Sequence, residues 1–305
     1  MTPVTAGVRV PCSTSNLGSG FDTLGLALDR YLEARFAPAP REELVLERRG
    51  TLSALELPME EDLAVQAFRH VAAEEGWTPA GTLTLHSEIP LARGLGSSAA
   101  ALVAGHAVAR AALGLPEDRR AAFELAASVE GHGDNAAPCA FGGLHGVARD
   151  GDRIRAVPLE LSPEVGFAYA APAAGISTRA AREALPATVE HATAVRELGR
   201  LTALLRGLAT ADPELVRIGI QDELHVPHRL PLIPGAVNAI SAGYDAGAWA
   251  VTISGAGSGL IAFCARSDAE GVSRAMHRIL APDDAADAVG LVLAPDLDGA
   301  RILTP

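Results

Sequence analysis

Lysine is absent from this chain of 305 residues, so all 25 side chains counted as lysine or arginine are arginines. This absence excludes any catalytic mechanism that relies on a lysine side chain. Basic charge is also in short supply, because the net charge is −12 and no basic block offsets it. A nucleic-acid-binding face needs such a block. We therefore expect no nucleic acid among the partners.

Cysteine is scarce, and long apolar runs are missing. The three cysteines, Cys12, Cys139 and Cys264, lie far apart and form no Cys-x-x-Cys pair, which favours a reducing compartment. No apolar stretch is long enough to span a bilayer. Residues 1–6 lack the basic segment and apolar run that mark a signal peptide. We expect a cytoplasmic protein with no membrane partner.

The apolar sequence that is present suffices for packed cores. The chain is 49% hydrophobic and 20% charged, and its length favours about two domains. Apolar periodicity predicts helices over residues 62–75, 99–113, 116–127 and 193–208. Strands are predicted over residues 8–10, 44–48, 83–86, 167–172, 251–254 and 260–263. A turn is expected at residues 142–151, with a second half beginning at residues 157–163.

The most informative stretch is residues 90–102, which lie between a predicted strand and a predicted helix. Gly94 and Gly96 lack a β-carbon, so backbone N–H groups can approach a bulky anion closely. Ser97 and Ser98 open the helix, where unpaired N–H groups and the helix dipole favour negative charge. The pattern predicts a phosphate site, although no Gly-Lys-Ser/Thr follows as in the common nucleotide loop. The alternative is a turn whose serines merely cap the helix.

A second unusual loop covers residues 11–22. It consists largely of small polar residues and glycines, and long loops of this kind are often functional. Asn16 and Asp22 place an amide and a carboxylate at its two ends. These side chains either bind a ligand or cap the loop.

A third stretch, Glu-Gly-His-Gly-Asp-Asn-Ala-Ala-Pro, covers residues 130–138. His132, Asp134 and Asn135 bring an imidazole, a carboxylate and an amide within four residues. A metal centre is disfavoured because no third ligand follows at a recognisable spacing. The stretch therefore predicts a site for a polar ligand. Glu124, on the preceding predicted helix, would ordinarily face solvent.

Three of these features resemble the motifs of a known family. The segments 11–22, 90–100 and 254–259 are similar, in order and spacing, to the three motifs of the GHMP small-molecule kinases. That family is named for galactokinase, homoserine kinase, mevalonate kinase and phosphomevalonate kinase. The resemblance covers essentially the whole chain.

Within that family the resemblance is greatest to the homoserine kinases. Their first motif, Asn-Leu-Gly-x-Gly-Phe-Asp, is present at residues 16–22, and their Glu-Gly-His-Pro-Asp-Asn-x-Ala-Pro segment is similar to residues 130–138. Further matches lie at residues 178–182, 221–229 and 295–300. The sequence departs from the family pattern at Ser19, Gly133 and Ser258-Gly259, where the family has Pro, Pro and Pro-Thr/Ser. These positions shape the backbone, so they bear on loop rigidity more than on chemistry.

The resemblance implies an α+β protein with the two-domain GHMP kinase fold. Residues 1–155 would form a ribosomal-S5-domain-2-like, ATP-binding N-terminal domain. Residues 156–305 would form a C-terminal ferredoxin-like α/β sandwich, with the active site in the cleft between the two halves. Homodimers are common in the family, although nothing in the sequence itself points to one.

The resemblance also implies an activity, the transfer of the γ-phosphoryl group of ATP to the hydroxyl of L-homoserine. The product would be O-phospho-L-homoserine, an intermediate of threonine biosynthesis. By similarity, Mg²⁺ would be held by Ser98 and Glu124. ATP would bind along one continuous segment: Pro90, Leu91, Ala92, Arg93, Gly94, Leu95, Gly96, Ser97, Ser98, Ala99 and Ala100.

The acceptor site implied by the resemblance suits an amino acid, because a guanidinium binds a carboxylate and a carboxylate binds an ammonium or a hydroxyl. It would comprise Asn16, Asp22, His132, Arg182 and Arg229. Asp22, Asp134 and Asn135 are the catalytic candidates. The family is divided between a catalytic aspartate and catalysis by positioning and charge stabilisation, and we favour the latter. Asp134 would then be either a structural residue or a partner that orients His132.

Two other functions stay open at this point. The chain could be a GHMP kinase that acts on a different alcohol, such as mevalonate or shikimate, since both also carry carboxylates. It could also be a non-catalytic nucleotide or amino-acid sensor that kept the fold. The presence of Ser98, Glu124 and Asn135 argues against a sensor.

Overall fold

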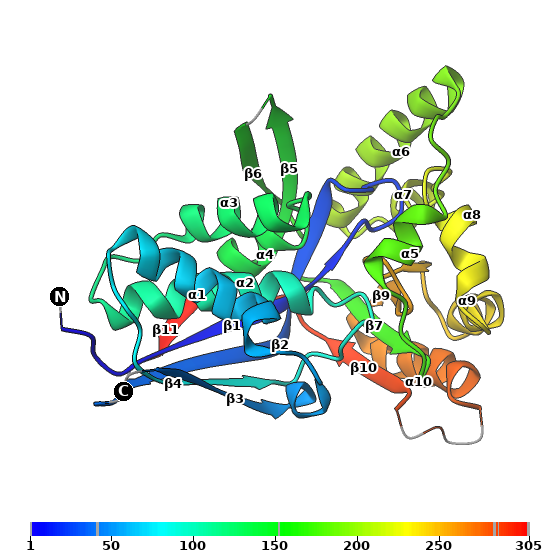
Figure 1. Ribbon diagram of the computed structural model, residues 1–305. Coiled ribbons are helices and arrows are strands. Elements are labelled where there is room, and N and C mark those ends of the chain that lie inside the picture. Colours follow the sequence, from blue (N-terminus) through cyan, green and yellow to red (C-terminus); the bar gives the residue numbers. More distant parts are fainter. Residues whose placement is uncertain (1, 41–42, 152, 283–284, 286, 304–305) are drawn as a thin grey trace.

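The computed structural model describes residues 2–40, 43–151, 153–282, 285 and 287–303. Within these ranges the chain forms two β-sheets, each carrying helices (Figure 1). The first sheet has the strand order β11–β1–β2–β4–β3, and β5 and β6 extend it as a hairpin from β2. Its strands are β1 (Ala6–Ser15), β2 (Leu24–Pro38), β3 (Leu44–Gly50), β4 (Gly81–Ser87), β5 (Leu144–Asp150), β6 (Arg153–Leu159) and β11 (Arg301–Leu303).

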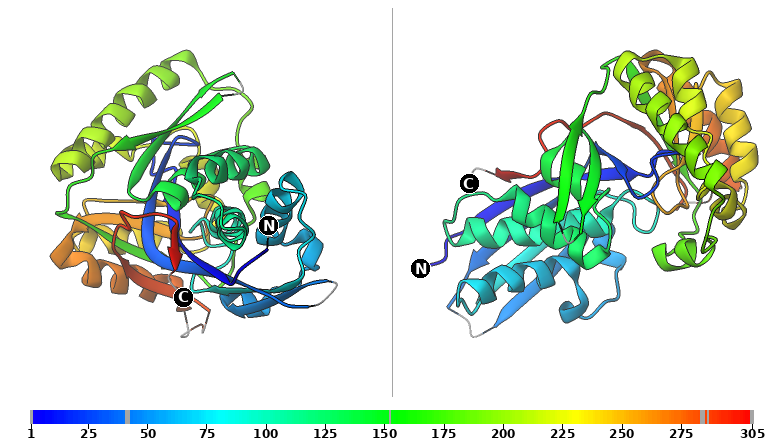
Figure 2. Two further views of the ribbon diagram at one scale, coloured as in Figure 1. Left: turned by 90° about the vertical axis from the view of Figure 1, so that its left-hand side faces the viewer. Right: turned by 90° about the horizontal axis from the view of Figure 1, so that it is seen from above.

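Helices cover one face of the first sheet (Figure 2). Helices α2 and α4 pack directly on β1 and β2, and α1 and α3 flank α2. The short turns η1 (Thr51–Ala54) and η2 (Met59–Glu61) join β3 to the first helix. The helices are α1 (Leu63–Glu74), α2 (Ser97–Ala112), α3 (Arg119–Glu130) and α4 (Ala136–Phe141).

The start of α1 confirms the prediction made from its sequence. Asp62 accepts hydrogen bonds from the backbone N–H groups of Ala64 and Val65, so it caps the helix as expected. Phe68 and Val71, which recur at helical spacing, are buried. A capped, amphipathic segment of this length forms a helix only because its apolar face packs against α2.

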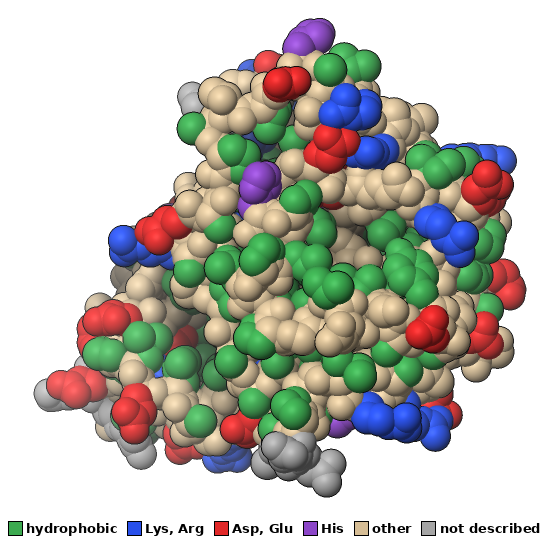
Figure 3. All heavy atoms as spheres, turned by 90° about the vertical axis from the view of Figure 1, so that its right-hand side faces the viewer, with side chains coloured by type: hydrophobic (Ala, Val, Ile, Leu, Met, Phe, Trp, Pro, Cys, Tyr) green, Lys and Arg blue, Asp and Glu red, His purple; other side chains and the backbone are tan. Residues whose placement is uncertain are grey.

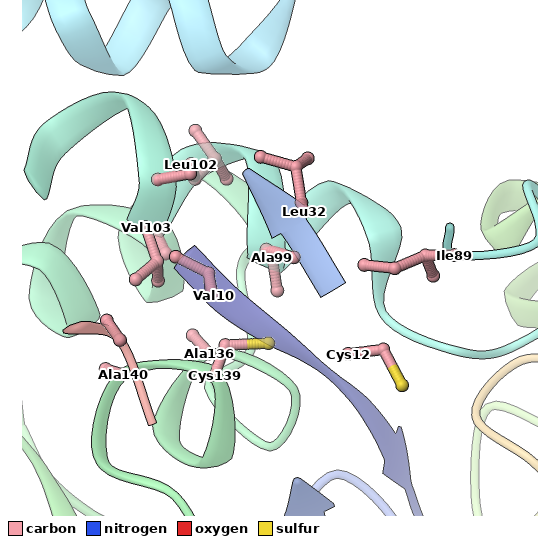
Figure 4. Packing of buried hydrophobic residues seen from close by; sticks show 14 of the residues in the cluster. Val10, Cys12, Leu32, Ile89, Ala99, Leu102, Val103, Ala136, Cys139 and Ala140 are labelled. Carbon is pink, nitrogen blue, oxygen red and sulfur yellow. The ribbon is translucent and has the colours of Figure 1, made fainter. Parts of the chain in front are cut away.

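Small side chains let the helices approach the sheet closely. Figure 4 shows Ala99 and Val103 of α2 near Val10 of β1, and Ala136 and Cys139 of α4 near the same strand. A β-carbon at Gly105 would lie 2.0 Å from the carbonyl oxygen of Ala64, so the contact between α1 and α2 requires glycine there. The alanine-rich composition of α2 therefore reflects its position between the sheet and two helices.

The second sheet has the strand order β10–β7–β9–β8, and all its pairs are antiparallel. This order is that of a ferredoxin-like βαββαβ unit whose first crossover carries several extra helices. The strands are β7 (Val165–Ala171), β8 (Ala250–Ile253), β9 (Leu260–Ala265) and β10 (Val289–Leu293). The helical elements are α5 (Thr178–Glu183), α6 (His191–Thr210), α7 (Pro213–Gly219), α8 (Val226–Arg229), η3 (Leu230–Leu232), α9 (Ala236–Asp245), η4 (Arg266–Asp268) and α10 (Ala269–Leu280).

Strands β7, β8 and β9 are buried on both faces of the second sheet, and one of these faces packs against the first domain. Phe167 and Tyr169 of β7 belong to the large core that continues into the first domain. Ala168 and Ala170 point the other way, into a separate core beneath α9 and α10. This arrangement confirms the two-domain α+β prediction.

The structure corrects two predictions about how the chain is divided. Residues 142–151 are mostly strand β5 rather than a turn, because they pair with β2 and β6. The outer half of β5 is exposed, which removes the apolar alternation that marks a half-buried strand. The predicted boundary between residues 155 and 156 falls inside β6, and β11 returns from the end of the chain to pair with β1. The outer limits, residues 1 and 305, lie outside the described residues.

Figure 3 shows the end of the molecule formed by the second domain. Hydrophobic side chains gather near the middle of this face, and charged side chains lie mostly toward its margins. The exposed apolar residues on η3 and α9 include Leu232, Val237 and Tyr244. Among the described helices, none combines the length and apolarity needed to cross a membrane.

Candidate active site

A cavity of about 360 Å³ lies between the two domains. Its volume is typical of a site for a small molecule. The cavity is lined by residues of the three predicted motif segments and by parts of both domains. Its polar lining includes Ser15, Asn16, Asp22, Asp62, Arg93, Ser97, Ser98, Glu130, His132, Asp134, Asn135, Ser177, Thr178, Arg182 and Arg229.

The middle of the cavity is formed by the predicted phosphate loop and the start of α2. Gly96 precedes the helix with a φ of 62°, and no side chain of the described residues caps the helix N-terminus. The first-turn N–H groups of an α-helix have no partner within the helix. Ser97 and Ser98 carry such groups, and both residues line the cavity. This end of α2 can therefore bind an anion.

The phosphate loop is held by the third motif segment. Ser254 Oγ donates a hydrogen bond to the Gly94 carbonyl oxygen at 2.7 Å, and Tyr169 Oη donates to that of Arg93 at 2.6 Å. The Arg93 guanidinium is itself bound to backbone carbonyl oxygens. The position of the loop thus depends on contacts across the domain interface.

Replacing Gly94 with alanine should lower the free energy of unfolding by at least about 2 kcal/mol. Gly94 has a φ of 75°, and a β-carbon there would lie 1.9 Å from the Ser254 carbonyl oxygen. Gly114 is the matched control, because its φ is 66° and a β-carbon added there would have nothing within 4 Å. Gly114→Ala should therefore cost only the backbone strain, about 1 kcal/mol. Urea unfolding of both variants measures the difference, and equal losses would contradict the contact.

One end of the cavity is apolar. It is lined by Leu52, Leu55, Leu57, Leu63 and Leu85. The segment that carries the first three of these is held by Arg48, whose guanidinium donates to the Asp62 carboxylate at 2.9 Å and to the Leu57 carbonyl oxygen at 2.8 Å. This end can enclose a flat, largely apolar group next to the phosphate loop.

Ser98 and Glu130 form a hydrogen-bonded pair beside the phosphate loop. Ser98 Oγ donates a hydrogen bond to Glu130 Oε1, whereas Glu130 Oε2 is buried and has no partner among the described residues. Burial raises the pKa of the Glu130 carboxyl above its ordinary value. A buried carboxylate oxygen without a partner, next to a hydroxyl, is a donor set that suits a hard divalent cation.

The structure corrects the predicted partner of Ser98. Glu124 accepts a hydrogen bond from Arg120 Nε at 2.8 Å, its side chain is 42% exposed, and it does not line the cavity. Glu124 and Glu130 are six residues apart on α3, so they point in directions about 120° apart. Glu130 opens the segment 130–138, and its place in that segment was the signal that could have identified it.

His132, Asp134 and Asn135 lie together at the polar end. His132 Nδ1 is 2.6 Å from Asp134 Oδ1. Burial alone would lower the pKa of His132, but the hydrogen bond and charge of Asp134 outweigh it and raise that pKa. The Asn135 amide accepts from Ser13 Oγ and donates to Ser15 Oγ, each at 3.0 Å, so its orientation is fixed.

Asp22 and Arg182 face each other across the cavity wall in a bidentate pair. The two hydrogen bonds measure 2.8 and 2.9 Å. Asp22, His132 and Asp134 each offer one atom that could ligate a metal, and these three atoms lie within 4.8 Å of one another. Because Arg182 already neutralises Asp22 and His132 is bound to Asp134, we interpret this set as a hydrogen-bonded network rather than a metal centre.

Asn16 connects the first motif segment to the third. Its Nδ2 donates to the Gly255 carbonyl oxygen at 2.6 Å, and its Oδ1 accepts from the Asp22 N–H at 2.9 Å. Both ends of the amide are therefore engaged in holding loops. This places Asn16 in the cavity wall with less capacity for a ligand than its neighbours.

Arg229 is a buried cation in the cavity wall. It is only 2% exposed, and its partners among the described residues are the carbonyl oxygens of Ala181 (3.1 Å) and Gly255 (3.4 Å) and the ring of Phe21. Burial, together with the nearby Arg182, lowers the pKa of Arg229 below its ordinary value. A buried guanidinium whose described partners include no carboxylate is a strong site for an anionic ligand.

The three departures from the family pattern are each accommodated. Ser19 Oγ donates to the Gly219 carbonyl oxygen at 2.6 Å. A β-carbon at Gly133 would lie 2.8 Å from Ile154 Cδ1, and one at Gly259 would lie 2.2 Å from the Tyr169 hydroxyl. Packing from other segments occupies the space that the family's larger residues would take.

Comparison with known proteins places these features in a family. Residues 62–143 match the family model described as GHMP kinases N terminal domain, and residues 203–282 match GHMP kinases C terminal. The chain is 44% identical over 260 residues to a homoserine kinase of Moorella thermoacetica, which covers 84% of this chain and 86% of that one. It is 39% identical over 275 residues to a homoserine kinase of Thermus thermophilus, covering 90% and 92%.

Solved structures agree with this similarity. The crystal structure of a homoserine kinase from Cytophaga hutchinsonii aligns with a TM-score of 0.88 and 27% identity, covering 99% of this chain and 98% of that one. The L. major mevalonate kinase aligns with a TM-score of 0.71 over 96% of each chain. Its identity is 14%, so that likeness concerns the fold alone.

Proposed function

The chain belongs to the GHMP kinases, and we propose that within this family it transfers the γ-phosphoryl group of ATP to the hydroxyl of L-homoserine. The product is O-phospho-L-homoserine, so the enzyme serves threonine biosynthesis. The relatives named homoserine kinase, at 39–44% identity over most of the chain, support the substrate. The geometric observation that carries the proposal is Arg229, a buried cation with no described carboxylate partner at the polar end of the cavity.

ATP would lie along the phosphate loop. The apolar end of the cavity suits the base, and the uncapped start of α2 suits the phosphates. Residues 90–100 contain no lysine, so N–H groups of the loop would supply much of the interaction with phosphate. This assignment keeps the predicted nucleotide segment.

Mg²⁺ would be held by Ser98 and Glu130 rather than by Ser98 and Glu124. The unpartnered, buried oxygen of Glu130 supports this choice. One carboxylate and one hydroxyl suffice, because Mg²⁺ keeps several waters and also binds phosphate oxygens. The bound ion would neutralise charge on the transferred phosphoryl group.

L-Homoserine would bind with its carboxylate at Arg229. Its ammonium would lie at Asp22, which Arg182 and the Asn16 amide hold in place. His132 lines the same part of the cavity as Asp22 and can bind a polar atom of the substrate. The hydroxyl would then point toward the phosphate loop, where the nucleotide ends.

In the reaction, the homoserine oxygen forms a bond to the γ-phosphorus while the bond to the β–γ bridging oxygen breaks. ADP would leave with the bridging oxygen, and the hydroxyl proton would pass to an oxygen of the transferred phosphoryl group and from there to solvent. Asp22 is paired with Arg182 and Asp134 with His132, so each candidate carboxylate is already engaged in an ionic hydrogen bond. This supports catalysis by positioning and charge stabilisation, with Asp134 orienting His132 and Asn135 ordering the site.

The direct test is ADP release from Mg²⁺–ATP with L-homoserine, mevalonate and shikimate offered separately. We expect turnover with L-homoserine, and at least about 100-fold lower kcat/KM with the other two alcohols, because neither carries an ammonium to pair with Asp22. Turnover with another alcohol instead would keep the kinase and overturn the acceptor. Failure with all three, in protein that still binds ATP, would favour the sensor.

The homodimer and the cytoplasmic location stay predictions. Sedimentation velocity of the purified protein tests the first.

A further inference from the structure

We propose that Asp222, which does not line the cavity, is a positioning residue that orients Arg229 by fixing the start of helix α8. The inference rests on the proposed function, in which Arg229 binds the carboxylate of the acceptor. It assigns specificity for the acceptor to a buried side chain that itself never touches the substrate.

The Asp222 carboxylate organises the backbone before α8. Its side chain is fully buried, and Oδ1 accepts from the N–H of Leu224 at 3.0 Å. Oδ2 accepts from the N–H groups of His225 at 2.7 Å and Val226 at 2.6 Å. Hydrogen bonds from N–H groups to a charged carboxylate are stronger than those between neutral groups. Three consecutive backbone donors are thus fixed by one side chain.

A short path connects this carboxylate to Arg229. The N–H of His225 is bound to Asp222, and the carbonyl oxygen of the same residue accepts from the N–H of Arg229 at 3.0 Å. Helix α8 spans only four residues, Val226–Arg229. A helix of one turn has almost no stability of its own, so its geometry depends on what holds its first residues. Asp222 holds them.

A stack of side chains completes the connection. The rings of Phe21 and His225 are stacked with centroids 5.1 Å apart, and Arg229 Cζ lies 5.1 Å from the centroid of the Phe21 ring. His225 Nε2 is 3.1 Å from the carbonyl oxygen of Gly18, which can only accept, so Nε2 donates. The first motif segment and the start of α8 are therefore locked together around the Arg229 guanidinium.

Two further observations agree with this role. Among the described residues, the Arg229 side chain donates hydrogen bonds only to carbonyl oxygens and makes a cation–π contact with Phe21, so no ion pair with a described residue fixes its direction. Burial lowers the pKa of His225 to about 4, so the imidazole is neutral near pH 7 and adds no second cation beside the guanidinium. The guanidinium direction is then set by the backbone of α8, by Phe21 and by the carbonyl oxygens of Ala181 and Gly255.

The test is a double-mutant cycle on the full-length enzyme, with KM measured for L-homoserine and for ATP. Asp222→Ala should raise the KM for L-homoserine by about tenfold or more, while the KM for ATP changes less than about twofold. Asp222→Asn keeps one acceptor oxygen and should give a smaller increase. If Asp222 acts through Arg229, the double variant Asp222→Ala/Arg229→Ala should match Arg229→Ala alone. A contribution independent of Arg229 would make the two effects multiply, and would overturn the proposal.

Asp212 provides the matched control. It is also an aspartate that accepts from backbone N–H groups at a helix start, those of Glu214 and Leu215 on α7. Unlike the helix after Asp222, α7 carries no residue that lines the cavity. Asp212→Ala should leave the KM for L-homoserine within about twofold of wild type. An equal rise in both control and test variants would mean a general loss of stability and would contradict the specific role.

The same experiment tests the acceptor site at Arg229 and the positioning role of Asp222 separately. An unchanged KM for L-homoserine in Arg229→Ala would overturn the acceptor site of the proposed function. A large effect of Arg229→Ala with none of Asp222→Ala would overturn the positioning role and leave the proposed function in place. If Asp222→Ala does not give folded protein by circular dichroism, Asp222→Asn carries the same comparison, and an unchanged KM for L-homoserine there contradicts the proposal.

Discussion

Replacing Glu130 with glutamine should reduce kcat with Mg²⁺–ATP and L-homoserine by at least about 100-fold. The change preserves shape but removes the charge of the carboxylate whose second oxygen is buried without a partner beside Ser98. Without that charge the site would bind Mg²⁺ poorly, so the phosphoryl group would lose its charge stabilisation. Steady-state kinetics at rising Mg²⁺ measure the effect, and the variant should need a higher Mg²⁺ concentration for half-maximal rate.

Glu124→Gln is the control for this prediction. It makes the same chemical change on the same helix, but Glu124 is partly exposed and bound to Arg120. An exposed pair of this kind is screened by water and contributes little to stability, so turnover should stay within about twofold of wild type. Loss of activity in Glu124→Gln with normal activity in Glu130→Gln would reinstate the original metal pair and remove Glu130 from the site.

Much of the fold could be predicted because its local signals were strong. The capping Asp62 and the apolar spacing after it defined α1, and the strand–glycine–serine–helix pattern defined β4 and α2. The two-domain architecture came from the family resemblance, since the periodicity alone would fit many α/β arrangements. Strand β11 could not be predicted, because three residues carry no periodic pattern and its partner β1 is almost 300 residues earlier.

In the site, too, contacts between residues close in sequence could be predicted, whereas contacts that depend on packing between distant segments could not. His132, Asp134 and Asn135 were expected to meet because they are adjacent in sequence, and they do lie together in the cavity. The Asp22–Arg182 pair spans 160 residues, so its bidentate geometry depends on how the two domains pack. Glu124 was assigned by similarity without knowing which face of α3 it occupies. That face is decided by the packing of α3 on α2 and α4, and it selects Glu130.

Replacing Arg229 with alanine should raise the KM for L-homoserine by about 100-fold or more, while the KM for ATP changes less than about threefold. Arg229 is only 2% exposed, so a carboxylate bound to it would be shielded from water and the interaction correspondingly strong. A loss of about 3 kcal/mol corresponds to this change in affinity. Arg229 lies on α8, whereas the phosphate loop precedes α2, so nucleotide binding should be affected little.

Two further variants serve as controls for the Arg229→Ala prediction. Arg229→Lys keeps a positive charge but loses the planar fork that binds both carboxylate oxygens, so it should recover only part of the affinity, because lysine is a point charge on a flexible chain. Arg217→Ala removes an exposed arginine of the neighbouring helix α7, whose Nε donates to the Trp249 carbonyl oxygen outside the cavity, and should leave both KM values near wild type. Equal increases in the KM values for L-homoserine and ATP in Arg229→Ala would instead make Arg229 a structural cation, because an acceptor-binding residue must discriminate between the two substrates.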